Sequence, residues 1–204
     1  WVAETADCPK RISVWDTETG KNVDEFFGAS AYFAYGYIDK DRPDEIYARN
    51  VLWDIDWENY DTEPKSTVWR ATDPNMAPAP NTGSHTSGGG FRIITADNGQ
   101  QYGWGGAGGS RGTVFYIRDG NLFKPFAGVI NPWKDSFPAL EDYKKKRTKE
   151  WDEQGLAGYK RPHNLFWQDA NEDNKVSADE VTTLQGIGHP TQLKRDLRIL
   201  MTSG

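Results

Sequence analysis

Alternation of apolar and polar residues is the clearest pattern in the chain. Between residues 51 and 58, the odd positions carry Val51, Trp53, Ile55 and Trp57, whereas most of the even positions are acidic. Successive side chains of a strand point to opposite faces of its sheet. The pattern therefore predicts a half-buried strand whose odd positions face the core.

Three further segments have the pattern of β-hairpins with glycine in the turn. They cover residues 11–27, 91–104 and 112–126, with turns around Gly20, Gly99 and Gly120. Glycine suits these turns because it adopts positive φ without a Cβ clash. Residues 32–39 and 45–47 add two strand candidates. An imperfect repeat of strand pairs is typical of radial β architectures such as propellers, in which neighbouring blades hide strand edges.

Two insertions interrupt the β pattern, near residues 72–90 and 131–161. The first is rich in Pro, Gly and Ser, and predicts a surface loop. The second contains the best helix candidate, residues 138–156, with Pro138 in the first turn and Gly155 at the stop. The residues expected on its apolar face are Leu140, Tyr143, Arg147 and Trp151.

The segment RISVWDTETGKNVDEFFG, residues 11–28, resembles the blade motif of NHL/YVTN-type β-propellers from large secreted bacterial proteins. The resemblance is good over residues 1–28, fair over 91–130 and returns at 165–181. It implies a mainly all-β fold of repeated antiparallel sheets, forming a single propeller-like module over residues 1–204, in an extracellular or periplasmic location. A blade needs about 40–50 residues, so we expect a partial propeller or a fragment of one.

Charge and composition exclude several classes of protein. The chain has 204 residues and a net charge of −6, and its one basic run, 144–147, is followed by acidic residues. Nucleic-acid binding needs clustered Lys and Arg, so a nucleic-acid partner is not expected. The longest stretch of low polarity, 26–38, is too short to span a membrane. Cys8 is the single cysteine, which excludes an internal disulfide and leaves the role of Cys8 open.

The strongest chemical motif is the segment 169–180, which resembles an EF-hand calcium loop. The expected metal ligands are Asp169, Asn171 and Asp173 at positions one, three and five, the carbonyl of Lys175 at seven, Ser177 at nine and Glu180 at twelve. Calcium prefers several hard oxygen ligands, and alternate residues of a tight loop can direct theirs inward together. Calcium is therefore the expected cofactor.

The calcium motif departs from the EF-hand pattern in two respects. Position six is Asn174 instead of glycine, and because that position needs a left-handed backbone, weaker binding is expected. The flanks also differ, since residues 164–167 have a strand pattern, while Gly186 and Gly188 limit any exiting helix. Val176 at position eight supplies an apolar anchor. We expect a structural calcium loop mounted on a sheet, without the paired loops of a calcium sensor.

Other candidate catalytic patterns are weaker. Residues 108–112 match the G-x-S-x-G sequence of a nucleophile elbow around Ser110, with His163 and His189 downstream. An elbow needs a strand before its serine and a helix after it, whereas a glycine-rich loop precedes Ser110 and a predicted strand follows. The spacing of these histidines and His85 is not that of a metal site.

Acidic and aromatic side chains offer two further candidate sites. Asp54, Asp56 and Glu58 share one face of a predicted strand and, in a concave site, would bind a cation or act as acid and base. A solvated outer face is the simpler interpretation. Trp104 lies in a glycine-rich segment where, if exposed, its ring would stack on a sugar.

These features favour a calcium-stabilised, propeller-like module that acts in binding or assembly, with another protein chain or a polysaccharide as its partner. One alternative is a carbohydrate-active enzyme, a lyase or hydrolase, that uses acidic and aromatic residues at the mouth of a propeller. Another is a structural fragment completed by a partner chain. No catalytic residue is assigned from the sequence.

Overall fold

The computed structural model describes residues 2–3, 12–26, 36–48, 51–59, 61–68, 75, 91–106, 112–120, 122–134, 137–184 and 187–203. Its strands are β1 (Val2–Ala3), β2 (Ile12–Trp15), β3 (Asn22–Phe26), β4 (Gly36–Asp39), β5 (Arg42–Ala48), β6 (Val51–Asp56), β7 (Asp61–Val68), β8 (Arg92–Thr95), β9 (Gln101–Gly106), β10 (Gly112–Asp119), β11 (Leu122–Ile130), β12 (Leu165–Gln168), β13 (Val181–Thr183), β14 (Ile187–Leu193) and β15 (Ile199–Ser203). The helices are η1 (Pro138–Leu140), α1 (Glu141–Glu153) and η2 (Gly158–Lys160).

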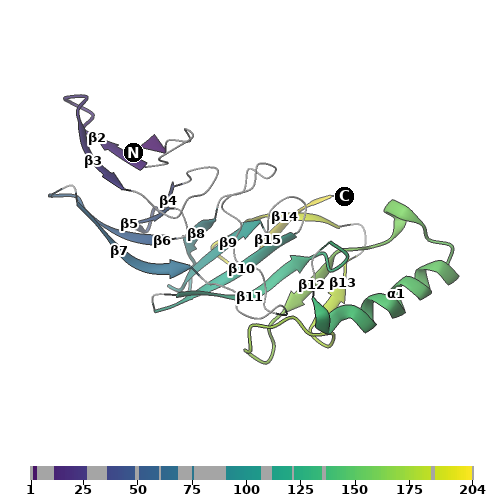
Figure 1. The fold of residues 1–204 in the computed structure, drawn as a ribbon. Helices are drawn as coiled ribbons and strands as arrows, with labels where there is room; N and C mark the ends of the chain where they lie inside the picture. Colours follow the sequence, from purple (N-terminus) through teal and green to yellow (C-terminus); the bar gives the residue numbers. More distant parts are fainter. Residues whose placement is uncertain are drawn as a thin grey trace.

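The prediction of a mainly β, antiparallel fold with one inserted α-helix is confirmed (Figure 1). The strands form a three-stranded sheet, β1-β2-β3, a ten-stranded sheet and the two-stranded sheet β14-β15. The main path of the large sheet runs β4-β5-β6-β7-β11-β10-β9-β8, with β12 and β13 attached beside β11. The described strands form no closed barrel and are compatible with part of a propeller, whose radial blades stay a prediction.

All three predicted hairpins are present, as β2–β3, β8–β9 and β10–β11. The β10–β11 hairpin is the longest and lies at the centre of the large sheet. Its strand β11 pairs with β10 along one edge, and with both β7 and β12 along the other. The contact with β7 is parallel and the contact with β12 is antiparallel. This hairpin therefore joins the two halves of the sheet.

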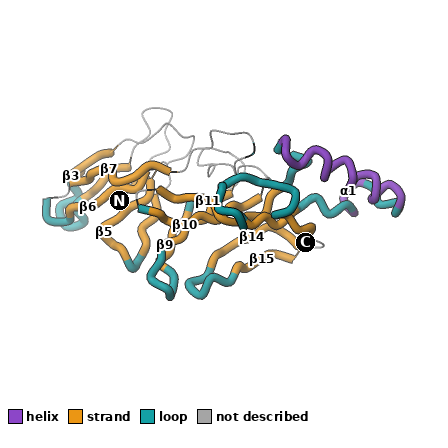
Figure 2. Tube along the Cα trace, turned by 90° about the horizontal axis from the view of Figure 1, so that it is seen from below, coloured by secondary structure: helices purple, strands orange, loops and turns teal. Residues whose placement is uncertain are grey.

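Both faces of the central hairpin are covered by apolar side chains. Val114 and Tyr116 face the main core, whereas Phe115 between them belongs to a second cluster on the opposite face. The main core also contains the buried side chains Tyr47, Leu52, Phe91, Ile93, Phe123, Ile130, Phe137, Leu140, Leu165, Trp167 and Val176. Leu193 of β14 and Ile199 of β15 pack into the second cluster, so this small sheet covers the second face (Figure 2).

Strand β6 differs from the prediction based on alternation. Leu52, predicted on the polar face, is completely buried, whereas Trp57, predicted in the core, is 44% exposed. Two features explain the difference. The pairing of β6 with β7 shifts between Leu52 and Trp53, which breaks the strict period of two, and Trp57 lies in the turn after the strand.

The predicted helix is confirmed in position and in its buried face. Leu140 and Trp151 are buried, Tyr143 and Arg147 are half-buried, and Gly155 follows the helix with a φ of 68°. Figures 1 and 2 show α1 at one end of the molecule and β3 at the other. Within the described parts of the chain, no helix is long and apolar enough to cross a membrane.

An aromatic cluster packs the end of α1 against the loops before and after it. The ring of Trp151 lies 4.8 Å from that of Trp133 and 5.4 Å from that of His163, and the guanidinium carbons of Arg147 and Arg161 each lie 5.8 Å from the Trp151 ring. Burial, followed by the positive charges of Arg161 and Lys134, lowers the pKa of His163. The neutral imidazole is therefore the form that fits this cluster.

We predict that Gly103→Ala strongly destabilises the fold. A Cβ at Gly103 would lie 2.1 Å from Cζ of Phe91, whose ring is fixed among Tyr47, Tyr116 and Phe123. The expected loss is about 1–3 kcal/mol of unfolding free energy, measured by urea denaturation. Adding Phe91→Leu should recover part of it, and a failure of this second change to recover any stability would contradict the steric cause.

A second prediction concerns pH. Because the folded-state pKa of His163 lies below its unfolded value, the unfolded chain binds more protons, and stability falls as pH decreases through the ordinary histidine pKa of about 6.5. His163→Phe keeps an aromatic ring without a titrating group. Its melting temperature should fall less than that of the wild type between neutral and mildly acidic pH; identical profiles would rule out this role for His163.

Candidate metal centre

The predicted calcium loop connects two paired strands. Strand β12 precedes the loop and β13 follows it, with Trp167 opposite Val181. The backbone N–H of Gln168 donates to the carbonyl of Glu180 at 3.2 Å, and the N–H of Asp169 donates to the carbonyl of Phe126 in β11 at 2.9 Å. The hairpin therefore brings the first and last ligand positions together, and β11 fixes where the loop begins.

Three carboxylates converge inside the loop. Asp169, Asp173 and Glu180 each place a carboxylate oxygen within 4.8 Å of the other two. Backbone N–H groups hold two of these side chains: those of Asp173 and Asn174 donate to the two oxygens of Asp169 at 3.1 and 3.0 Å, and that of Ala170 donates to Glu180 at 3.0 Å. This triad matches positions one, five and twelve of the predicted ligand set.

The other three predicted ligands lie in the same loop with different partners. Asn171 accepts a hydrogen bond from the N–H of Asp173 at 3.0 Å, and the Ser177 hydroxyl donates to Glu180 at 2.8 Å. The carbonyl of Lys175 accepts from Nε1 of Trp167 at 3.1 Å. Asn171 and Ser177 are thus bonded to members of the triad, while Lys175 is oriented by the core tryptophan.

The backbone of the loop has the left-handed conformation expected at position six. Asn174 has a φ of 60°, and Glu172 at position four has the same value. The apolar anchor is also where the sequence places it: Val176 is completely buried in the main core, and its N–H donates to the carbonyl of Asn75 at 2.8 Å. One side of the loop is therefore fixed to the core, while the carboxylates remain near the surface.

Burial and the neighbouring carboxylates affect the protonation of Asp169. The pKa of Asp169 is raised, first by burial and then by the negative charges of Glu180 and Asp173, while hydrogen bonds from the N–H groups of Asn174 and Asp173 act in the opposite direction. A cation among these oxygens would remove the repulsion. The ligand atoms are all oxygen, which suits hard cations such as calcium or magnesium.

Most of the weaker candidates gain no support from the structure. Cys8, His85 and Ser110 lie outside the described residues, as does the side chain of His189, and only Asn75 of the 72–90 insertion is described. His163 packs between tryptophan rings, as described above. Trp104, a sugar-stacking candidate only if exposed, is 5% exposed and lies in β9, so it does not meet that condition.

The acidic face of β6 contributes to a turn. Asp56 accepts hydrogen bonds from the N–H groups of Glu58 and Asn59 at 2.9 and 3.0 Å and from the Asn59 amide at 2.8 Å. Hydrogen bonds from Asn59 are the main reason that the pKa of Asp56 is lowered. Its carboxylate therefore closes the turn after β6, which agrees with the simpler interpretation of a solvated face.

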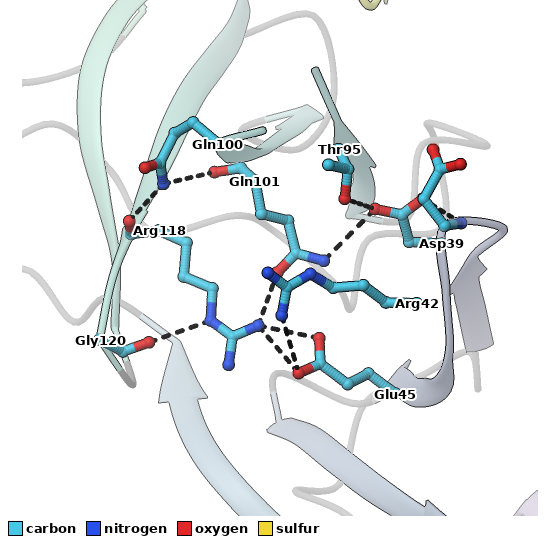
Figure 3. A network of polar contacts seen from close by, with 9 residues as sticks. Asp39, Arg42, Glu45, Thr95, Gln100, Gln101, Arg118 and Gly120 are labelled. Atoms are coloured by element: carbon cyan, nitrogen blue, oxygen red, sulfur yellow. Dashed lines mark hydrogen bonds and ion pairs between the residues drawn. The ribbon is translucent and has the colours of Figure 1, made fainter. Parts of the chain in front are cut away.

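Sequence reasoning missed a buried polar network at the ends of five strands (Figure 3). Nη1 of Arg118 in β10 donates to the carboxylate of Glu45 at 2.8 Å and to Oε1 of Gln101 at 2.8 Å. Asp39 of β4 accepts from the Thr95 hydroxyl at 2.7 Å and from the Gln101 amide at 3.4 Å. Asp39, Glu45 and Gln101 are each 2% exposed, so these bonds take the place of water.

This network joins distant parts of the large sheet. Thr95 lies in β8, one end of the strand path, and Asp39 lies in β4, the other end. Glu45 has Arg118 as its counter-charge, and Arg42 lies 3.5 Å from the same carboxylate. The arrangement links the two ends of the curled sheet. It also gives each buried carboxylate a hydrogen bond or an ion pair with a neighbouring side chain. No local sequence pattern identifies it, because the partners are far apart in the chain.

We predict that Glu45→Ala destabilises the protein by about 3–5 kcal/mol, because it leaves the nearly buried Arg118 without its counter-charge. The exposed pair Lys124–Asp119 is the matched control, and Lys124→Ala should cost less than about 1 kcal/mol. Urea denaturation measures both changes. Equal losses in the two variants would show that burial of the Glu45–Arg118 pair is unimportant.

Comparisons of the chain with protein-family models, with curated proteins and with solved structures give no match.

Proposed function

We propose that the chain is a calcium-stabilised binding or assembly module that acts outside the cytoplasm, with a propeller-like arrangement of its sheets. The observation that carries this proposal is the convergence of Asp169, Asp173 and Glu180 within one loop whose remaining positions also follow the calcium pattern. Calcium at extracellular concentrations, on the order of 10⁻³ M, suits a site in the weaker range of such loops.

Calcium fits this site better than magnesium does. Magnesium needs a small, regular octahedron and retains several waters, whereas calcium accepts more oxygens in an irregular arrangement. The loop offers carboxylate, amide, hydroxyl and carbonyl oxygens from Asp169 to Glu180, at the alternating positions that an irregular cage uses. The Glu180 oxygen that accepts from the Ser177 hydroxyl keeps a second lone pair, so this hydrogen bond is compatible with bidentate coordination.

The proposed ion stabilises the fold instead of switching it. Val176 fixes one side of the loop in the core, and β12 and β13 fix both of its ends. A loop held at three points has little freedom to transmit a large movement. Neutralising the clustered carboxylates would instead strengthen the attachment of the β12–β13 hairpin to β11. The module would then present a stable surface to a partner, for which we propose a protein chain.

The proposal predicts that calcium raises the melting temperature of the metal-free protein. At a calcium concentration of 100 times Kd, the gain is about 2.7 kcal/mol, or about 5–10 °C for a chain of this size. Removal of calcium with EDTA should reverse the shift. Differential scanning fluorimetry measures the shift, and isothermal titration calorimetry measures affinity for calcium and for magnesium separately.

Variants in the loop test whether the effect comes from this site. Glu180→Gln should weaken calcium binding more than about tenfold, because it removes a charge from a ligand position. Glu172→Gln removes a charge from the same loop at a non-ligand position and should weaken it by much less. No calcium-dependent shift in the wild type, or equal effects of the two variants, would contradict the proposed site.

A further inference from the structure

A groove of about 590 Å³ lies between the second face of the large sheet and the small sheet β14–β15. Tyr102, Ile117 and Phe126 line it from the large sheet, and Leu193, Leu197 and Ile199 line it from the β14–β15 hairpin. Asp169, Glu172 and Asn174 of the proposed calcium loop border it as well. Its volume is that of a typical ligand site, about 300–1,000 Å³, and its lining is mainly apolar.

The hairpin side of the groove is held in place. Arg195, in the turn between β14 and β15, contacts Asp41 at 2.5 Å and Asp97 at 3.3 Å, and its carbonyl accepts a hydrogen bond from the N–H of Asp97. Leu193 is 3% exposed in the second cluster. The turn end of this wall is thus fixed to the large sheet, which favours a preformed groove.

Leu197 marks the mouth of the groove. Its φ is 64°, a left-handed conformation that is unusual for a bulky residue, and its side chain is 42% exposed. The turn keeps it there through a hydrogen bond from its N–H to the carbonyl of Lys194 and through the Arg198–Asp196 ion pair. Backbone strain and an exposed leucine at the edge of an apolar groove are both features of binding sites.

The charged residues around the groove determine which charge a bound ligand should carry. Arg118 is paired with Glu45, and Lys124 is paired with Asp119 at 2.5 Å. Asp169 directs its carboxylate to the N–H groups of the calcium loop. Glu172 is exposed and makes no hydrogen bond or ion pair in the part of the chain that the structure describes. The groove therefore has an apolar floor, and Glu172 at its edge is a negative charge with no hydrogen bond or ion pair among the described residues.

We propose that this groove binds a peptide segment of a partner protein, one that carries a large apolar side chain next to a lysine or arginine. The apolar side chain would lie on Ile117, Phe126 and Leu197, and the basic side chain would pair with Glu172. A saccharide is a poorer match, because Arg118, Lys124 and Asp169 of the lining are already committed to hydrogen bonds or ion pairs within the protein. This inference rests on the proposed binding role and specifies its partner class.

Selection from random heptapeptides displayed on phage, with the calcium-loaded protein as bait, tests this inference. We expect enriched peptides that combine Phe, Leu or Trp with an adjacent Lys or Arg, and their synthetic forms should bind in fluorescence anisotropy. Replacing the basic residue of such a peptide by Glu should weaken binding to the wild type. Enrichment of acidic peptides, or of none, overturns the proposal.

Two variants locate the binding on the protein. Leu197→Gly removes part of the apolar wall and relieves a left-handed conformation, so it should weaken peptide binding about tenfold while raising the melting temperature. Glu172→Gln should weaken binding about threefold and abolish the preference for Lys over Glu in the peptide. Glu18→Gln, an exposed carboxylate in the turn between β2 and β3, is the matched control and should change neither property.

The outcomes separate this proposal from the proposed calcium site. A calcium-dependent melting shift without peptide enrichment overturns the groove proposal and leaves the calcium site supported. Peptide binding that Leu197→Gly and Glu172→Gln leave unchanged also overturns it, because the peptides then bind elsewhere. Peptide binding lost in both variants without any calcium effect supports the groove and contradicts the calcium site.

Discussion

Burial of the β10–β11 hairpin on both faces is the constraint on which the rest of the structure depends. Val114 and Tyr116 contribute to one cluster and Phe115 to the other, so the hairpin is the shared layer of both. Apolar burial of this kind is the main favourable contribution to folding. The paired strands β9 and β12, the small sheet β14–β15 and the proposed calcium loop all take their positions from this hairpin.

Charged side chains have different partners in the core and at the surface of this fold. Glu45 is buried and has Arg118 as its partner, whereas Asp169, Asp173 and Glu180 lie together near the surface and form no ion pair with any residue that the structure describes. A buried pair is costly to separate, because either charge alone would be poorly solvated. A surface cluster of like charges is instead relieved by a cation. The Glu45–Arg118 pair therefore suits a fixed structural contact, and the carboxylate cluster suits an exchangeable ion.

Local features of the fold were predictable from the sequence, and distant contacts were not. Turn chemistry located the hairpins at Gly20, Gly99 and Gly120, and the spacing from Asp169 to Glu180 located the carboxylate cluster, because both depend on neighbouring residues. The burial of Leu52 depends on a shift in pairing with β7. The Glu45–Arg118 pair depends on how the whole sheet curls, and strand patterns carry no information about that curvature.

The proposed calcium site and the proposed peptide groove share a wall. Asp169 is both a member of the carboxylate cluster and part of the groove lining. Asn174, whose left-handed backbone shapes the loop, also lines the groove. An ion that fixes this loop therefore also fixes one wall of the groove. A preformed wall reduces the ordering cost of binding a partner. Calcium would then strengthen peptide binding without touching the peptide, through the loop that both sites use.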